Sequence, residues 1–108
     1  MSWRARHTAP GSRNISRIED WYIIRVLHIV SSVNINSGVM SVLMNYYRHM
    51  DRSEIQFDFV YYTENNTPNY KNEIASGGGR CFLVAPPNHD PVGFERDIHR
   101  LYKEHYGD

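Results

Sequence analysis

Small polar side chains gather in residues 31–38, SSVNINSG, between an apolar run and a segment with helical spacing. The first amides of a helix have no intrahelical acceptor, and together with the helix dipole they favour an anion. A glycine at that point leaves the backbone open to a ligand, and neighbouring Asn and Ser side chains add donors and acceptors. We therefore predict that Asn36, Ser37 and Gly38 form a loop that binds a phosphate or a sugar hydroxyl.

The residues of this loop leave a second interpretation open. The segment contains neither GxGxxG nor GxxxxGK[ST], the glycine patterns most closely tied to phosphate binding. Either Ser37 or Asn36 can instead act as the N-cap of the helix that follows. In that case the loop is a turn that begins a helix and binds nothing.

The histidines do not form a metal-ligand pattern. His99 and His105 are six residues apart, so they do not share a helical face as ligands at i and i+4 would. His28 lies inside an apolar run on a predicted strand, where a packed and hydrogen-bonded histidine is the stronger expectation. We predict no metal site and no cofactor.

Cys81 and Asp58 are the remaining candidates for reactive chemistry. The sequence locates no base for Cys81, so we predict a small core residue and not a nucleophile. Asp58 lies between two phenylalanines and is predicted to be a solvated position on an edge-side strand. An acid that binds a ribose is the alternative for Asp58. No catalytic residue is assigned.

Alternating elements must position these residues. Apolar or alternating runs predict strands over residues 22–32, 54–63 and 80–87, and helical spacing predicts helices over 38–50, 69–76 and 93–107. This alternation favours right-handed crossovers and a parallel sheet. The predicted fold class is α/β, a Rossmann-like parallel three-stranded sheet with flanking helices. Ligands of such sheets bind at the carboxyl ends of the strands, where the loop of residues 31–38 falls.

Two of the predicted helices have an apolar side that we expect to face the core. In the first helix this side consists of Val39, Val42, Leu43, Tyr46 and Met50. In the last helix it consists of Phe94, Ile98, Leu101, Tyr102 and His105. The charged residues of the last helix are expected to form an exposed face of mixed sign.

The composition is that of one small domain: 108 residues, of which 41% are hydrophobic and 22% are charged. The 12 basic and 12 acidic residues cancel, which argues against a nucleic-acid binder. A single cysteine excludes an internal disulfide and fits the cytoplasm. We predict a flexible basic tail over residues 1–21 and a partial Rossmann-like domain over residues 22–108.

Two long segments of the sequence resemble a known family. RVLHIVSSVNINSGVMSVLMNYYRHMDRSEIQFDFVYYT and NEIASGGGRCFLVAPP are similar to the start of bacterial GT-B glycosyltransferases, most of all the retaining enzymes that build capsular polysaccharides and exopolysaccharides. These enzymes open with a VLHV strand, a loop ending in a glycine pair and a helix similar to LMNYYR. An IQFDF strand, a helix ending in Gly-Gly and a strand closing on prolines follow. The resemblance covers roughly residues 24–106.

The resemblance implies transfer of a sugar from a nucleotide-sugar donor to a saccharide or lipid-linked acceptor. The glycine pair of the family, which lies beside the donor and near the acceptor, corresponds to Ser37 and Gly38, so one glycine is replaced. A glutamate that often lies two residues beyond the pair corresponds to Met40. The family has a second domain that supplies most donor contacts, and this chain resembles only part of the first, acceptor-side domain. The chain alone is therefore expected to be inactive.

Two other classes of function stay open at this point. The chain could be a non-catalytic module that binds a phosphorylated small molecule or a partner chain, or an inactive truncated product. If the chain is part of a glycosyltransferase, we expect a cytoplasmic protein, with peripheral association at the inner face of the membrane. We also expect the first strand, residues 26–30, to have an open edge through which the chain self-associates.

Overall fold

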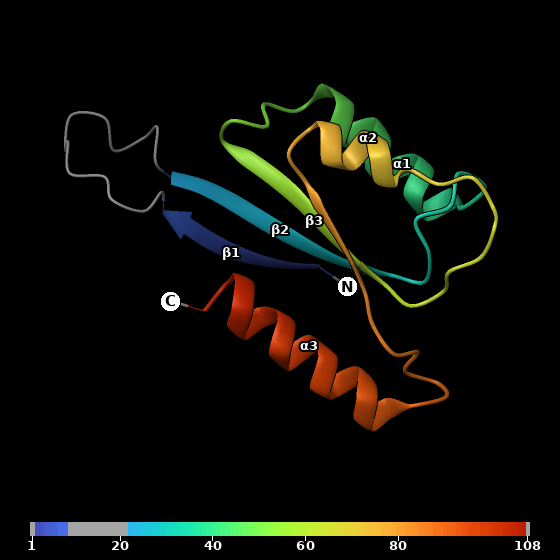
Figure 1. Ribbon diagram of the computed structural model, residues 1–108. Helices are drawn as coiled ribbons and strands as arrows, with labels where there is room; N and C mark the ends of the chain where they lie inside the picture. The colour runs from blue at the N-terminus through green and yellow to red at the C-terminus, as the bar shows by residue number, and fades with distance from the viewer. Residues whose placement is uncertain (1, 9–21, 108) are drawn as a thin grey trace.

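The computed structural model describes residues 2–8 and 22–107 (Figure 1). From residue 22 onward the predicted alternation of strands and helices is confirmed. The elements in chain order are β1 (Ser2–Thr8), β2 (Tyr22–Val30), α1 (Gly38–His49), β3 (Ile55–Tyr61), α2 (Lys71–Ser76), β4 (Arg80–Leu83) and α3 (Pro91–His105).

The sheet has the strand order β1-β2-β3-β4. β2 pairs in parallel with β3 from Ile24↔Ile55 to Val30↔Tyr61, and β3 pairs in parallel with β4. Helices α1 and α2 cover one face of these strands and α3 covers the other (Figure 1). This arrangement confirms the predicted fold class, a Rossmann-like parallel three-stranded sheet with flanking helices, and adds a fourth strand to it.

The fourth strand corrects the prediction made for residues 1–21. Ser2–Thr8 form β1, which pairs antiparallel with β2 from Ser2↔His28 to Thr8↔Tyr22. The prediction that the first parallel strand has an open edge is therefore wrong, and the expected self-association through that edge is no longer supported. An antiparallel edge strand needs no continuous apolar run, so composition gave no sign of it. Residues 9–21 lie outside the described residues.

Two apolar clusters lie on opposite faces of the sheet. Side chains of β2 and β3 alternate between them, as the pleat requires. The cluster beneath α1 and α2 consists of Val30, Val33, Met40, Met44, Tyr47, Phe59, Tyr61 and Ile74. The cluster beneath α3 consists of Leu27, Val60, Val84, Ile98, Leu101 and Tyr106.

The core-facing side predicted for α1 is wrong in position. Met40, Met44 and Tyr47 are the buried residues of this helix, whereas Val39 and Val42 of the predicted side are exposed. Tyr46 is also exposed, and only Leu43 and Met50 reach the core from the predicted side. The helix is apolar around more than half of its circumference, so the pattern alone did not decide which part packs on the sheet.

The side predicted for α3 is largely confirmed. Ile98 and Leu101 are buried and Phe94 packs against the same cluster, but Tyr102 is 46% exposed, contrary to the prediction. Pro91 begins the helix, and the Asp90 carboxylate caps it by accepting a 3.0 Å hydrogen bond from the Gly93 amide. None of the helices in the described part of the chain is long and apolar enough to cross a membrane.

Candidate functional site

The loop of residues 31–37 leaves the carboxyl end of β2 and is held by neighbouring segments through its backbone. The Ser31 carbonyl accepts a 2.8 Å hydrogen bond from the Thr63 amide, just beyond β3. The Val33 carbonyl accepts a 2.9 Å bond from the Tyr70 amide, and the Ile35 amide donates to the Pro68 carbonyl at 2.9 Å. The loop therefore lies at the end of the sheet where ligands of doubly wound folds bind, as the sequence predicts.

The two halves of the loop differ in burial. Ser32, Val33 and Asn34 are buried, and the Asn34 side chain donates a 3.3 Å hydrogen bond to the side-chain oxygen of Asn65. The following half, which contains Asn36, is exposed. The buried half thus fixes the path of the backbone and presents the exposed half to solvent.

Ser37 is the N-cap of α1, which decides between the two predicted caps. Its side-chain oxygen accepts a 3.3 Å hydrogen bond from the Met40 amide, and its carbonyl accepts the first helical bond from Ser41 at 3.0 Å. Capping gives the Met40 amide an acceptor. The amides of Gly38 and Val39, at the start of the helix, have no carbonyl acceptor within the helix. These two amides are available to an anion at the helix N-terminus.

Gly38 occupies open space. A Cβ atom added to it would meet no heavy atom within 4 Å. Among the described residues only Gly78 has a glycine-type positive φ, at 96°, so the backbone at Gly38 is one that other residues adopt. Neither steric crowding nor backbone conformation requires a glycine at position 38.

A charged group at the same end of the sheet escaped the sequence reasoning. Glu64, beyond β3, accepts hydrogen bonds of 2.8 Å from Lys71 at the start of α2 and from the Tyr61 hydroxyl. The hydrogen bond from Lys71, followed by that from Tyr61, lowers the pKa of Glu64. An isolated bridge between Asn34 and Asn69 brings this region against the loop. The cluster of polar residues after the second predicted strand was the available signal.

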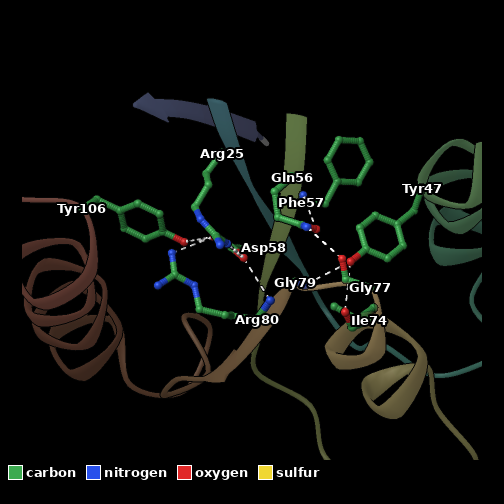
Figure 2. A network of polar contacts seen from close by, with 10 residues as sticks. All are labelled: Arg25, Tyr47, Gln56, Phe57, Asp58, Ile74, Gly77, Gly79, Arg80 and Tyr106. Atoms are coloured by element: carbon green, nitrogen blue, oxygen red, sulfur yellow. Dashed lines mark hydrogen bonds and ion pairs between the residues drawn. The ribbon is translucent and has the colours of Figure 1, made fainter. Parts of the chain in front are cut away.

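Asp58 corrects the prediction of a solvated edge position. It is fully buried on β3, between β2 and β4 (Figure 2). Its carboxylate accepts hydrogen bonds from Arg25 at 2.8 Å, from the Arg80 amide and guanidinium at 2.9 and 3.1 Å, and from Tyr106 at 2.5 Å. Burial and the Asp58 carboxylate raise the pKa of Tyr106, so its hydroxyl stays protonated and donates. With these donors in place the carboxylate is a structural group, which removes the ribose-binding alternative.

The glycine-rich turn of residues 77–79 is crowded. The Tyr47 hydroxyl donates to the Ile74 carbonyl and accepts from the Gly79 amide, both at 3.0 Å (Figure 2). The Gln56 side chain donates to the Gly77 carbonyl at 2.9 Å. A Cβ atom on Gly79 would lie 2.5 Å from the Phe57 carbonyl oxygen. These glycines therefore serve the fold by letting α2 turn into β4 against Tyr47.

His28 and Cys81 are packed residues. The His28 ring lies 4.3 Å from that of Phe57 and 5.4 Å from that of Phe59, and burial lowers the pKa of His28 to about 4. Burial raises the pKa of Cys81 to about 11, which disfavours a thiolate nucleophile. Over residues 2–8 and 22–107, no three His, Cys, Asp or Glu side chains group as metal ligands.

Comparison with known proteins finds a bacterial relative. The chain is 42% identical over 81 residues, 74% of its length, to a Bacillus subtilis (strain 168) protein named "Putative glycosyltransferase EpsF". The aligned part spans only 21% of that protein. No family model matches the chain, and no solved structure matches it. The match supports a relationship with glycosyltransferases.

Proposed function

We propose that the chain is the N-terminal, acceptor-side part of a retaining GT-B glycosyltransferase. The reaction would transfer a sugar from a nucleotide-sugar donor to a saccharide or lipid-linked acceptor in the synthesis of a cell-surface polysaccharide. The observation that carries the proposal is the 42% identity over 81 residues to a protein named as a glycosyltransferase. Since the chain spans about a fifth of that relative, the activity is attributed to a larger assembly of domains and not to these residues alone.

The geometry of the loop supports a binding role within this function. The amides of Gly38 and Val39 at the start of α1 favour a phosphate oxygen, and the open space around Gly38 allows a ligand to approach the backbone. The exposed Asn36 side chain offers a donor and an acceptor to a sugar hydroxyl. Ser37 holds the helix terminus in place as its cap.

Saturation-transfer NMR, which detects weak ligands, tests the proposal on the intact chain with UDP-glucose, UDP-galactose and UDP-N-acetylglucosamine. We expect at least one of these to bind and no transferase activity. Gly38→Val should weaken binding about tenfold, because the added methyl groups occupy the space a ligand needs. Ser41→Val is the matched control, since it places the same side chain one turn later on the exposed side of α1.

Three outcomes contradict the proposal in different ways. Equal affinities of the Gly38→Val and Ser41→Val proteins would reduce the loop to a turn. Inorganic phosphate binding as tightly as the nucleotide sugars would favour the alternative of a module for phosphorylated small molecules. Turnover of donor and acceptor by the isolated chain would overturn the requirement for further domains.

A further inference from the structure

Strand β2 has the sequence of a strand that lies inside a sheet, whereas its neighbour β1 does not. The residues of β2, YIIRVLHIV, are mostly apolar and are buried on both faces, with Leu27 in the cluster beneath α3 and Val30 in the cluster beneath α1 and α2. Such strands ordinarily lie in the interior of a parallel sheet. β1, with the sequence SWRARHT, pairs antiparallel and has two arginines and a histidine among its seven residues. Basic residues of this kind are typical of edge strands.

The position of α3 indicates where a strand that follows it would lie. The connections from β2 to β3 and from β3 to β4 run through α1 and α2 on one face, and both move the chain in the same direction across the sheet. α3 lies on the opposite face (Figure 1). Because crossovers between parallel strands are right-handed, a connection through α3 moves the chain in the opposite direction, back toward β2. The position beyond β2 in that direction is the one that β1 occupies.

The end of α3 lies close to the start of this position. The Tyr106 hydroxyl, just beyond α3, donates a 2.5 Å hydrogen bond to Asp58. The same carboxylate accepts a 2.8 Å bond from Arg25, in the first half of β2. Figure 1 shows the C-terminal end of α3 at the same end of the sheet as the start of β2. A strand that follows α3 would therefore enter the sheet beside the start of β2 and run parallel with it.

We propose that β1 is a removable cover on the edge of β2, and that this edge is an interaction surface for an apolar, parallel strand of a longer glycosyltransferase, the strand that follows α3. The part of the Bacillus subtilis relative that aligns with this chain spans only 21% of that protein, so the relative has further segments that could supply such a strand. The identity of the partner rests on the proposed function. β1 and the partner strand would use the same row of backbone groups on β2, so only one of them pairs with β2 at a time.

The backbone amides of β2 report separately on the two sides of the strand. The Ile24 amide donates a 3.0 Å hydrogen bond to the segment that leads into β3. Amides along a strand point alternately to its two sides, so those of Val26 and His28 also point toward β3. We call these three the β3-side amides. The amides of Arg25 and Leu27 point toward β1, and we call them the β1-side amides.

Amide hydrogen exchange of the intact chain, followed by NMR, tests whether the cover opens by itself. We expect the β1-side amides to exchange about tenfold faster than the β3-side amides, because β1 leaves while the pairing of β2 with β3 persists. Equal exchange of the two sets would show that β1 opens only together with the rest of the sheet. Complete lack of protection at the β1-side amides would show that no strand covers this edge. Either result would overturn the proposal.

Two proline variants show that β1 is the cause of the protection. Ala5 pairs with Arg25, so its amide points toward β2, and Ala5→Pro removes a hydrogen bond of the ladder. We expect the exchange of the β1-side amides to rise about tenfold further in this variant. Thr8→Pro is the matched control, because Thr8 pairs with Tyr22 and its amide points away from β2. Equal effects of the two prolines on the β1-side amides would contradict the proposal.

An extended chain tests the identity of the partner. The whole chain is lengthened after Asp108 by about 20 residues of the Bacillus subtilis relative, those that follow its aligned segment, which is enough for one strand and its connection. The control carries the same added residues in scrambled order. We expect the extension to displace β1. The β1-side amides should become as protected as the β3-side amides, while the amides of Trp3 and Ala5 lose protection about tenfold.

The remaining results separate this proposal from the proposed function. Unchanged protection of Trp3 and Ala5 in the extended chain, or equal displacement of β1 by the scrambled extension, would overturn the assignment of the partner strand. Exchange is measured without any nucleotide sugar, so it does not depend on donor binding. Displacement of β1 in a chain that binds no nucleotide sugar would retain the removable cover and refute the proposed function. Nucleotide-sugar binding without displacement would do the reverse.

Discussion

Gly38 and the turn of residues 77–79 are both glycine-bearing junctions between a helix and a neighbouring segment, yet their surroundings are opposite. Gly38 is exposed at the start of α1, and a Cβ atom added there would have no heavy atom within 4 Å. A Cβ atom added to Gly77 would lie 2.6 Å from the Tyr47 hydroxyl, and Gly78 has a φ of 96°. The turn needs its glycines to fold, whereas the loop at Gly38 does not.

The difference bears on how a glycine is interpreted. A crowded glycine is explained by packing, so it says nothing further about ligands. An exposed glycine with ordinary backbone conformation has no such explanation, and close approach of a ligand to Gly38 is the role proposed for it above. Substitutions at the two junctions should therefore separate stability from binding.

The largest effect is expected for Gly79→Ala. The new methyl group would collide with the Phe57 carbonyl oxygen and with Ile74, at 2.5 and 2.7 Å, so backbone must move. We expect a loss of about 3 kcal/mol in the free energy of unfolding, measured by urea denaturation. A free energy of unfolding for Gly79→Ala equal to that of Gly38→Ala would show that the turn is as tolerant of a side chain as the loop.

The Tyr47→Phe substitution should come next. It removes the hydroxyl that donates to the Ile74 carbonyl and accepts from the Gly79 amide, so two hydrogen bonds are lost, although these two groups stay bonded to each other at 2.9 Å. The expected loss is about 2 kcal/mol by the same measurement. Tyr46→Phe is the matched control, because Tyr46 is 65% exposed, and it should change little.

Acidification should lower the free energy of unfolding through the buried side chain of His28. The pKa of His28 is lowered by burial to about 4 from an ordinary 6.5, so the unfolded chain binds the proton more tightly. The neutral His28 side chain makes its full contribution to the free energy of unfolding above about pH 6.5. This contribution is lost as the pH falls toward 4. Melting temperatures between pH 7 and 4.5 should fall less in His28→Phe than in the parent if this group is responsible.

Ser37→Ala should have a smaller effect. Ser37 accepts the Met40 amide at 3.3 Å as the N-cap of α1, and loss of a cap costs about 1 kcal/mol. Thermal unfolding monitored by circular dichroism would measure it. An unchanged melting temperature would mean that another group, such as the Asn36 side chain, takes over the cap.

The smallest effect on stability belongs to Gly38→Ala. The site has room for the methyl group, and alanine restricts the unfolded chain more than glycine does, so stability should stay equal or rise by up to about 1 kcal/mol. Nucleotide-sugar binding should nevertheless weaken. Destabilisation comparable to that of Gly79→Ala would erase the distinction between the two junctions.

Local patterns predicted the elements from residue 22 onward because each depends on neighbours within the segment. The stop of α2 at Gly77 and the position of the loop beyond β2 are examples. The partners of Asp58 were not predictable, since Arg25, Arg80 and Tyr106 are distant in sequence and meet only in the fold. The rotation of α1 was missed because both of its sides are apolar.

For the candidate site, the sequence predicted the place and the type of loop, but not its surroundings. Asn36, Ser37 and Gly38 follow a buried strand and precede a helix, which is a local pattern. The pairing of Glu64 with Lys71 depends on how the loop after β3 returns to α2, and no periodicity encodes that path. The binding role of the loop stays a proposal.

The antiparallel pairing of β1 with β2 has a consequence for the order in which the chain is made. Its paired residues are separated by between 14 residues, at Thr8↔Tyr22, and 26 residues, at Ser2↔His28. The parallel partner on the other side is farther away, 31 residues at Ile24↔Ile55. On a ribosome β2 would thus meet β1 as soon as it emerges, well before β3 exists. Early closure of this kind would shield a nascent, aggregation-prone strand while the rest of the sheet is still being translated.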